Sequence, residues 1–363
     1  MKLGITGLPN VGKSTLFNAL TRAGAEASNY PFTTIEPNFG VVPVPDPRLD
    51  SLAKIFLPQK IINATVEFVD IAGLVKGAGR GEGLGNKFLS HIRQVDAIVH
   101  VVRCFEASNV SHVDGGIDPA RDMETIDYEL LFSDMETVEK KIDRTKKLLK
   151  GDKSLEAGVA FYERVYAGLE KGTPGRNQEI DAKERRLFED LFLLTAKPVL
   201  YVANLSEADL ADVSQSPRYL AVSAAARAEG AAVLPLCVKI EEELSELGED
   251  DKALFLAEMG LERSGLDRLI AESYSLLGLI SFFTTLSKEV RAWTITNGTR
   301  APQAAGKIHT DFEKGFIRAE VVSFGDLTRV GSFAAAREKA YVRLEGKEYT
   351  MRDGDVVIFR FNV

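Results

Sequence analysis

The sequence is poor in cysteine, and this scarcity excludes several classes of protein. Only two cysteines occur among 363 residues, Cys104 and Cys237, and they lie far apart without forming a C-x-x-C pair. A disulfide-stapled secreted domain or a zinc ribbon needs more cysteines at closer spacing. We therefore expect both to be small buried side chains in a protein of a reducing compartment.

Long hydrophobic runs are also absent. No apolar segment approaches the roughly 20 residues that a helix needs to cross a bilayer. The N-terminus also lacks the positively charged segment followed by an apolar segment that is typical of a signal peptide. With 45% hydrophobic and 27% charged residues, the composition is typical of a globular enzyme of two or three domains. We expect a cytoplasmic protein with no membrane partner.

An overall excess of positive charge is lacking as well. The chain has 45 Lys and Arg against 53 Asp and Glu, a net charge of −8, which argues against indiscriminate nucleic-acid binding. We expect no sequence-specific DNA partner. Residues 281–363 nevertheless hold 13 basic and 10 acidic side chains, a net of +3, so the rest carries −11. Residues 139–150 form a second basic stretch; either region could meet phosphate, and a solvated helix face is the alternative.

Against these absences stands a phosphate-binding motif near the N-terminus. Residues 7–15 read GLPNVGKST and match G-x-x-x-x-G-K-[ST], between a short apolar run and a helix-forming segment. In such a loop the backbone N–H groups cradle the phosphates. Lys13 would neutralise the terminal phosphates, and Ser14 would offer its hydroxyl to Mg²⁺. The motif predicts a bound nucleoside triphosphate.

The fold around this motif is predicted from runs of apolar, β-branched residues. Such runs occupy residues 65–70, 97–103, 198–204 and 232–237. Continuous runs are typical of strands buried on both faces, as in a parallel sheet flanked by helices. We therefore predict an α/β fold, with a doubly wound, mainly parallel sheet in a P-loop nucleotide-binding domain formed by residues 1–120 and 198–280.

Two further regions depart from this pattern. In residues 121–197, apolar positions recur every three or four residues, and Gly151 with Asp152 separates two such segments, which predicts an inserted antiparallel helical hairpin. In residues 281–363, alternating segments predict half-buried strands around one short helix near 302–307. A small mixed β domain is thus expected to close the chain.

A second chemical motif, Asp70-Ile71-Ala72-Gly73, ends the run at 65–70. An Asp in this position can hold Mg²⁺ through water, and the Gly N–H can contact the γ-phosphate. Thr33 and Thr34 lie in the intervening loop, where nucleotide switches supply a threonine hydroxyl to Mg²⁺. Spacing alone does not choose between the two threonines.

The residue after Gly73 bears on hydrolysis. Many P-loop hydrolases carry a glutamine there to orient the attacking water, but this chain has Leu74. An apolar side chain cannot hydrogen-bond that water, so either hydrolysis is slow or another group orients the water. His112, in a polar loop beyond the run at 97–103, is a candidate. A solvated loop histidine is the alternative, and the residues alone favour it.

The segment that should recognise the base is Asn204-Leu205-Ser206-Glu207. A guanine-binding site has N-K-x-D here, whose carboxylate accepts from the N1–H and 2-amino groups of guanine. Leu205 and Glu207 replace this Lys and Asp, so the geometry that binds guanine is lost. Adenine lacks both of the guanine donors and does not need that geometry, so ATP is the preferred ligand. For the next base-binding loop, residues 237–239 are better placed than 223–224, which lie in an alanine-rich helical segment.

Taken together, these residues resemble the YchF-type Obg-like ATPases, a family of the translation-factor-related P-loop class. The resemblance covers essentially the whole chain and rests on GLPNVGKST, YPFTTIEPN, DIAGLVKGA with GEGLGNKFL, NLSE and the C-terminal AWTITNGTRAPQAAGKIHTDFEKGFIRAEV. It implies a nucleotide domain interrupted by a helical coiled coil and closed by a TGS-like β-grasp domain. It also implies preference for ATP, dependence on Mg²⁺ and a regulatory role at the ribosome, with the large subunit as the expected contact.

The resemblance also implies roles for individual residues. Leu205 with Asn204 would contact adenine, and His112 would stand in for the missing glutamine. Ser14 and Thr34 would bind Mg²⁺. The phosphates would be held by Asn10, Val11, Gly12, Lys13, Ser14 and Thr15.

Asn10 has a further implied role. It resembles the asparagine of relatives in which K⁺ near the phosphates supplies positive charge, so K⁺ is a possible activator. We therefore predict an ATP hydrolase whose chemistry gates a binding event, with Lys13 and His112 as catalytic residues. The alternatives are a GTPase of ribosome assembly and a nucleotide-stabilised ribosome- or RNA-binding scaffold with incidental hydrolysis.

Overall fold

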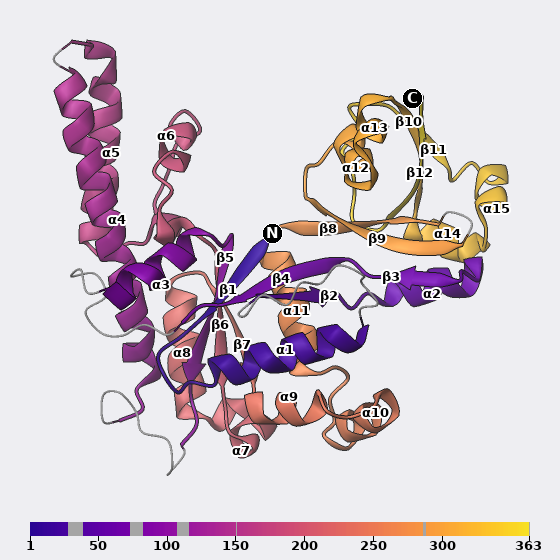
Figure 1. Ribbon diagram of the computed structural model, residues 1–363, viewed down its shortest axis with the longest axis horizontal. Helices are drawn as coiled ribbons and strands as arrows, with labels where there is room; N and C mark the ends of the chain where they lie inside the picture. The colour runs from indigo at the N-terminus through magenta and orange to yellow at the C-terminus, as the bar shows by residue number, and fades with distance from the viewer. Residues whose placement is uncertain (28–38, 73–82, 107–115, 150, 286–287, 363) are drawn as a thin grey trace. The chain divides into compact units, whose positions relative to one another are not determined.

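The computed structural model describes residues 1–27, 39–72, 83–106, 116–149, 151–285 and 288–362. The chain divides into two compact units, which are considered separately below (Figure 1). Of the described residues, the first unit contains those within 1–26, 39–40 and 67–269, and the second contains residue 27 and those within 41–66 and 270–362.

The first sheet is the framework of the nucleotide-binding domain. Its described strands lie in the order β2-β4-β1-β5-β6-β7, and the neighbouring pairs from β4 to β7 are all parallel. The strand bounds are β1 (Lys2–Thr6), β2 (Phe39–Pro43), β4 (Thr65–Asp70), β5 (Ala97–Arg103), β6 (Val199–Asn204) and β7 (Ala232–Leu236). The predicted doubly wound, mainly parallel sheet is confirmed.

Burial along the strands follows their place in this sheet. Every residue of the central strands β5 and β6 is buried, as their continuous apolar runs predicted. In β4 and β7, by contrast, buried residues alternate with half-buried or exposed ones, so the expectation of burial on both faces is wrong for these two strands. The reason is their place in the sheet, since β4 lies next to the edge strand β2 and β7 is itself an edge strand.

Helices connect these strands, and local sequence signals set several of their starts. For example, α8 begins with a proline at its first position and with Ser216 accepting a hydrogen bond from the Tyr219 N–H. The helices are α1 (Lys13–Ala27), α3 (Gly83–Arg93), α7 (Glu207–Ala211), α8 (Pro217–Ala228), α9 (Val238–Leu244), α10 (Glu249–Glu258) and α11 (Gly265–Leu276). Within the described residues, no helix has both the length and the apolarity that a membrane crossing requires.

The predicted helical hairpin is formed by α4 (Pro119–Leu149) and α5 (Glu156–Glu170), which pack along one another (Figure 1). Apolar side chains at helical spacing fill the space between them, including Val138, Val165 and Leu169. Asp152 lies in the connection and accepts a hydrogen bond of 2.9 Å from the Ser154 N–H. The periodicity of the two segments and the polar residue between them were sufficient to predict this pair.

The chain returns from the hairpin to β6 through short turns and one short helix, α6 (Arg185–Glu189). Asp134 of α4 is fully buried and holds this return in place. Its carboxylate accepts hydrogen bonds of 2.8 Å from the N–H groups of Leu194 and Thr195. The base of the hairpin is thereby fixed to the segment that enters the sheet.

The second unit contains a mixed sheet in the order β11-β10-β12-β8-β9-β3. β12 runs parallel to β8, while the pairs β8–β9, β10–β12 and β10–β11 are antiparallel. Packing of α12 (Ala301–Ile308) onto the buried side chains of this sheet completes a β-grasp arrangement. The strands are β3 (Lys60–Ile62), β8 (Leu279–Thr284), β9 (Glu289–Thr296), β10 (Phe316–Ser323), β11 (Arg343–Glu345) and β12 (Asp355–Phe361).

The helix content of this unit exceeds the expectation of one short helix. Within residues 288–362, α12 is accompanied by α13 (Thr310–Lys314), α14 (Phe324–Val330) and α15 (Phe333–Glu338). Each of the three added helices begins with a side-chain cap rather than an amphipathic repeat; for example, Ser323 accepts from the Asp326 N–H at 3.1 Å. Helices of five to seven residues are too short for periodicity to predict.

The compact units differ from the predicted domain limits at several places. Residues 121–197, predicted as a separate helical domain, belong to the first unit, and residues 270–280, predicted as part of the nucleotide-binding domain, belong to the second. Residues 41–66, which we also assigned to the nucleotide-binding domain, belong to the second unit as well. Their strand β3 pairs in parallel with β9 at the edge of the second sheet. Their helix α2 (Pro47–Phe56) is also fixed to this unit by polar contacts.

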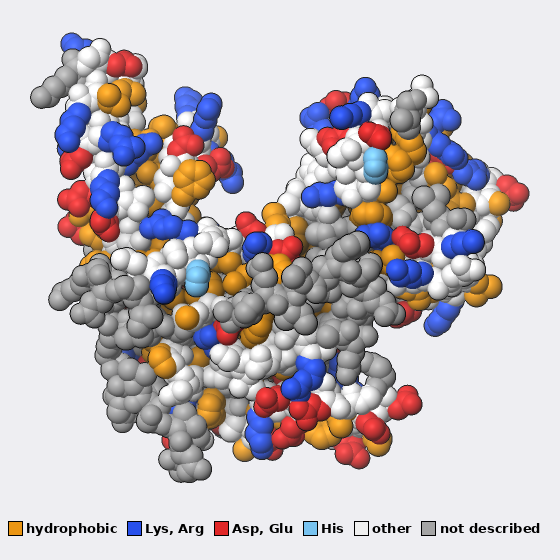
Figure 2. Space-filling view, in the orientation of Figure 1, with side chains coloured by type: hydrophobic (Ala, Val, Ile, Leu, Met, Phe, Trp, Pro, Cys, Tyr) orange, Lys and Arg blue, Asp and Glu red, His pale blue; other side chains and the backbone are white. Residues whose placement is uncertain are grey.

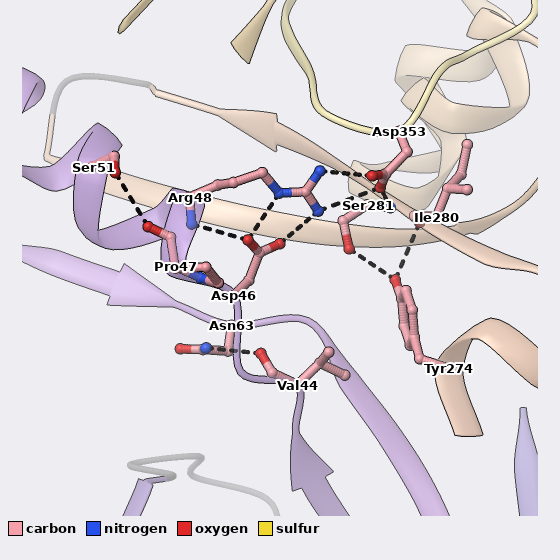
Figure 3. A network of polar contacts seen from close by, with 10 residues as sticks. All are labelled: Val44, Asp46, Pro47, Arg48, Ser51, Asn63, Tyr274, Ile280, Ser281 and Asp353. Carbon is pink, nitrogen blue, oxygen red and sulfur yellow. Dashed lines mark hydrogen bonds and ion pairs between the residues drawn. The ribbon is translucent and has the colours of Figure 1, made fainter. Parts of the chain in front are cut away.

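Arg48 is the centre of these polar contacts (Figure 3). Its guanidinium lies between Asp46, which caps α2, and Asp353, with Nη–Oδ distances of 2.8 and 2.7 Å. Asp353 also accepts a hydrogen bond of 2.9 Å from the Ser281 N–H at β8. A charged residue 305 positions away in sequence thus holds α2, and no local pattern contains that information.

Candidate nucleotide site

The predicted site residues of the first unit gather at one edge of the first sheet. Parallel pairing places the carboxyl ends of β4, β1 and β6 along the same edge. The phosphate loop follows β1, Asp70 ends β4, and Asn204 ends β6. Ligands of open α/β sheets bind outside the carboxyl ends of the strands, so the topology itself assembles this site.

The conformation of the phosphate loop explains its glycines. Gly12 has φ +94°, and a Cβ atom there would lie 2.5 Å from Asn204 Nδ2. A Cβ atom on Gly7 would lie 2.6 Å from the carbonyl oxygen of Val101. Asn10 also adopts a left-handed conformation, with φ +63°, which asparagine tolerates better than most residues. The phosphate loop therefore packs closely against β5 and β6, and side chains at Gly7 and Gly12 would prevent this packing.

Lys13 and Ser14 begin α1 at the point where the loop ends. The Lys13 ammonium forms an ion pair with the Asp70 carboxylate, and both side chains are largely buried. Ser14 Oγ donates to the other carboxylate oxygen of Asp70 at 3.4 Å. The structure thus brings together a cation, a hydroxyl and a carboxylate that the sequence had assigned to phosphate and Mg²⁺.

The oxygen donors present here fit a hard divalent cation. Mg²⁺ is usually bound by one or two protein oxygen ligands together with waters and nucleotide phosphates. The Ser14 hydroxyl and the Asp70 carboxylate supply such oxygens beside the phosphate loop. P-loop nucleotide hydrolases typically use Mg²⁺, and this donor set is consistent with that use.

Asn204 connects three parts of the site. Its side-chain amide donates to the Val11 carbonyl in the phosphate loop at 2.8 Å, and its Oδ1 accepts from the Val238 N–H at the start of α9 at 3.0 Å. Its backbone carbonyl accepts from the Cys104 N–H after β5 at 2.9 Å. Because Asn204 is 4% exposed, these bonds are protected from water. Asn204 therefore fixes the base-binding segment to the phosphate loop.

A cavity of about 550 Å³ adjoins these residues. It is lined by residues of the phosphate loop, of the segment after β5, of the segment after β6 and of the start of α9, namely Gly12, Thr15, Phe105, Glu106, Asn204, Leu205, Ser206, Glu207, Ala208, Cys237, Val238, Lys239 and Glu242. Its size suits a nucleotide base. Residues 237–239 line this cavity, whereas Ser223 and Ala224 lie within α8.

Phe105, an aromatic residue of the cavity lining, was not predicted from the sequence. Arg103 is buried beneath it, with its guanidinium 4.8 Å from the ring centroid and its Nε donating to the Phe105 carbonyl at 3.2 Å. A signal was present, since an aromatic residue directly after a buried central strand falls at the ligand-binding edge of a parallel sheet. Phe105 and Leu205 give the cavity apolar surface for a purine.

Three predicted site residues cannot be compared with the structure. Gly73, Thr34 and His112 lie outside the described residues, as does Leu74. Their assignments to the γ-phosphate, to Mg²⁺ and to the attacking water therefore stay predictions. The remaining predicted residues, from Asn10 to Thr15 together with Asp70, Asn204, Leu205 and Glu207, all lie in the site described above.

A phosphate loop between β1 and α1, an aspartate at the end of β4 and a base-sized cavity beyond β6 together define a P-loop nucleoside triphosphatase. A family model described as a 50S ribosome-binding GTPase matches residues 2–142, and the YchF-GTPase_C model, described as a protein of unknown function, matches residues 279–362. This chain is 54% identical over 361 residues to the protein named Ribosome-binding ATPase YchF from Bacillus subtilis (strain 168). It is 52% identical over 364 residues to the protein of the same name from Pasteurella multocida (strain Pm70). The chain belongs to the YchF family.

These similarities extend over whole chains. The match covers 99% of this chain and of the Bacillus subtilis relative, and 100% of this chain and 99% of the Pasteurella multocida relative. Among solved structures, that of the Schizosaccharomyces pombe YchF GTPase has a TM-score of 0.91 and 39% identity, covering 99% of this chain and 97% of that one. The names differ, ATPase for the bacterial relatives and GTPase for the Schizosaccharomyces pombe structure, so they do not identify the base.

Proposed function

We propose that this protein is an ATPase that binds the ribosome and acts as a nucleotide-gated regulator of translation or of a stress response. The observation that carries the preference for ATP is the base-binding segment, where Leu205 and Glu207 occupy the positions of the lysine and aspartate of a guanine site. The names of the bacterial relatives, Ribosome-binding ATPase YchF, agree with it.

Guanine and adenine differ in the hydrogen-bond donors that they present to the protein. Guanine presents its N1–H and 2-amino groups to a carboxylate, and a site that leaves such donors unpaired in a cavity binds guanine poorly. Glu207 lies on the cavity with its carboxylate directed to Lys239 at 2.8 Å. Adenine has neither donor, and the apolar surface of Leu205 and Phe105 suits its ring. The site therefore favours ATP.

The first expected result is a preference for ATP in direct binding. Calorimetric titration of the full-length protein with non-hydrolysable ATP and GTP analogues, in Mg²⁺ and K⁺, should give at least roughly tenfold tighter binding of the ATP analogue, a difference of ~1.4 kcal/mol. Equal or tighter binding of the GTP analogue would overturn the assignment and favour the assembly-GTPase alternative.

The proposed reaction is in-line attack of water on the γ-phosphate. Mg²⁺, when bound, neutralises charge on the β- and γ-phosphate oxygens. Ser14 and Thr34 would hold it directly, and Asp70 through water, while the Gly73 N–H would contact the γ-phosphate. Lys13 would leave Asp70 to pair with the phosphates, which carry more negative charge than one carboxylate.

Two further groups are proposed to assist this reaction. K⁺ beside Asn10 would add positive charge near the phosphates, a proposal supported by the resemblance of Asn10 to the asparagine of K⁺-activated relatives. His112 would orient the attacking water, since the glutamine of other P-loop hydrolases is replaced by Leu74. Both proposals are based on the sequence and on general chemistry.

Replacing His112 with alanine should lower the turnover of ATP roughly tenfold or more, because positioned acid–base groups commonly contribute at least that much. The affinity for ATP should stay unchanged, since the side chain acts on water and not on the nucleotide. Single-turnover hydrolysis and calorimetric titration measure the two quantities. Undiminished turnover in the variant would remove His112 from the reaction.

The ribosome is the proposed partner, and the large subunit the proposed contact. Besides the relatives' names, the description of the family model that matches residues 2–142 mentions the 50S ribosome. Figure 2 shows that Lys and Arg side chains on the α4–α5 hairpin are interspersed with Asp and Glu. Binding of this hairpin to ribosomal RNA would therefore depend more on contacts made by individual side chains than on a uniformly positive electrostatic potential. A ribosomal partner also implies a cytoplasmic protein.

A further inference from the structure

An ion pair at the rim of the base cavity, which no motif predicts, carries an inference about specificity. Lys239 Nζ lies 2.8 Å from Glu207 Oε1 and 3.9 Å from Glu243 Oε1. Glu207 is the first residue of α7, and Lys239 is the second residue of α9. Both line the cavity. The pair therefore joins the segment after β6 to the segment after β7 beside the place where a base would lie.

The pair changes what Glu207 can offer to a base. A carboxylate recognises guanine by accepting from N1–H with one oxygen and from the 2-amino group with the other. Here one oxygen already accepts from the Lys239 ammonium. The hydrogen bond that the Lys239 ammonium donates to Glu207 raises the pKa of Lys239 above its ordinary value and so favours the charged form. Guanine would have to displace this cation, whereas adenine has no donor that needs the carboxylate.

We propose that Lys239 is a specificity-determining residue, which discriminates against GTP by holding the Glu207 carboxylate in an ion pair. This inference rests on the proposed ATPase function and names the residue that enforces its choice of base. The motif Asn204-Leu205-Ser206-Glu207 retains an acidic residue where a guanine site has aspartate. The longer side chain of Glu207 and the cation supplied by α9 together make that acidic residue unavailable.

The exposure of the pair sets the expected size of the effect. The side chains of Lys239 and Glu207 are 69% and 55% exposed, so their pairing contributes little to the stability of the fold. Variants at either position should fold normally for the same reason. An exposed pair is worth at most about 1 kcal/mol, which limits the change in base preference to about fivefold.

The cavity offers a matched control. Glu106 also lines it and is paired with Arg218 of α8, with exposed side-chain fractions of 74% and 32%. Replacing Arg218 with alanine releases a carboxylate at the same cavity, but not the carboxylate of the base-binding motif. If any loss of positive charge at the rim improved GTP binding, this variant and the Lys239 variant would behave alike.

The test is calorimetric titration of four full-length proteins with non-hydrolysable ATP and GTP analogues in Mg²⁺. The four are the unchanged protein, Lys239→Ala, Arg218→Ala and the double variant Lys239→Ala with Glu207→Ala. In Lys239→Ala, binding of the GTP analogue relative to the ATP analogue should improve about fivefold. Arg218→Ala should keep the original ratio. The double variant should also keep it, because the released carboxylate is gone.

Three results would overturn the inference. The ratio could stay the same in Lys239→Ala, or GTP binding could weaken because Lys239 itself donates to the guanine O6 atom. The gain could also persist in the double variant, so that Glu207 would have no part in it. The unchanged protein tests the proposed function separately. If it binds the ATP analogue more tightly and Lys239→Ala leaves the ratio the same, only the inference fails; if it binds the GTP analogue more tightly, the proposed function fails as well.

Discussion

Replacing Lys13 with alanine should weaken the binding of ATP about 100-fold, because hydrogen bonds from an ammonium to a charged group are worth about 1.5–3 kcal/mol each. Turnover should fall by a further factor of about 100, since the same cation stabilises the charge that moves to the leaving group. No other lysine or arginine lies in the phosphate loop, residues 7–15. The loop therefore has no side chain that could replace Lys13.

The measurement must separate nucleotide binding from stability, because Lys13 is ion-paired with the largely buried Asp70. The unfolding midpoint is therefore recorded with and without ATP for each protein. A ligand present at 100 times its Kd stabilises the folded state by about 2.7 kcal/mol, and Lys13→Ala should lose nearly all of this increment. Lys171→Ala, at an exposed lysine after α5, is the control and should retain it. A full ATP-dependent increment in Lys13→Ala would contradict the assigned role.

The same variant distinguishes a nucleotide-gated regulator from a scaffold. Binding is measured by co-sedimentation with separated ribosomal subunits, in the presence of the ATP analogue. The unchanged protein should sediment with the large subunit, and Lys13→Ala should bind it more weakly. Undiminished sedimentation of the variant would favour a ribosome-binding scaffold whose hydrolysis is incidental. Sedimentation of the unchanged protein with the small subunit alone would contradict the proposed contact.

The phosphate half of the site was predictable because its chemistry and its position are contiguous in sequence. Residues 7–15 follow β1 and precede α1, so one motif supplies the loop, the cation and the hydroxyl together. Asp70 was predictable for a similar reason, because it ends a strand of evident length. The topology of a parallel sheet then places these residues at one edge without further information.

The other half of the site depends on contacts between distant segments. The pair of Lys239 with Glu207 joins residues 32 positions apart, and Arg103 places the Phe105 ring by packing that no spacing encodes. The grouping of residues 41–66 with the second unit likewise depends on Arg48 and its partner Asp353. Periodicity describes which face of an element is buried but not which element covers it. Such features became visible only in the folded chain.

Replacing Asn204 with alanine should affect stability and nucleotide binding together. The substitution removes the donor to the Val11 carbonyl and the acceptor for the Val238 N–H, two bonds of 2.8 and 3.0 Å made by a side chain that is 4% exposed. Leaving a buried polar group unpaired costs about 1–3 kcal/mol, and here one donor and one acceptor are affected. We expect the free energy of unfolding to fall by about 2–4 kcal/mol.

Binding of ATP should weaken roughly tenfold in the same variant, because the phosphate loop loses the contact that fixes it to the base-binding segment. Urea unfolding without nucleotide measures the first effect, and calorimetric titration below the unfolding transition measures the second. Asn18→Ala, at an exposed asparagine of α1, is the control and should change neither quantity appreciably. If Asn204→Ala weakened ATP binding with unchanged stability, Asn204 would act as a direct base contact and not as the connection between loop and cavity. Unchanged values of both would show that the two hydrogen bonds contribute nothing to the site.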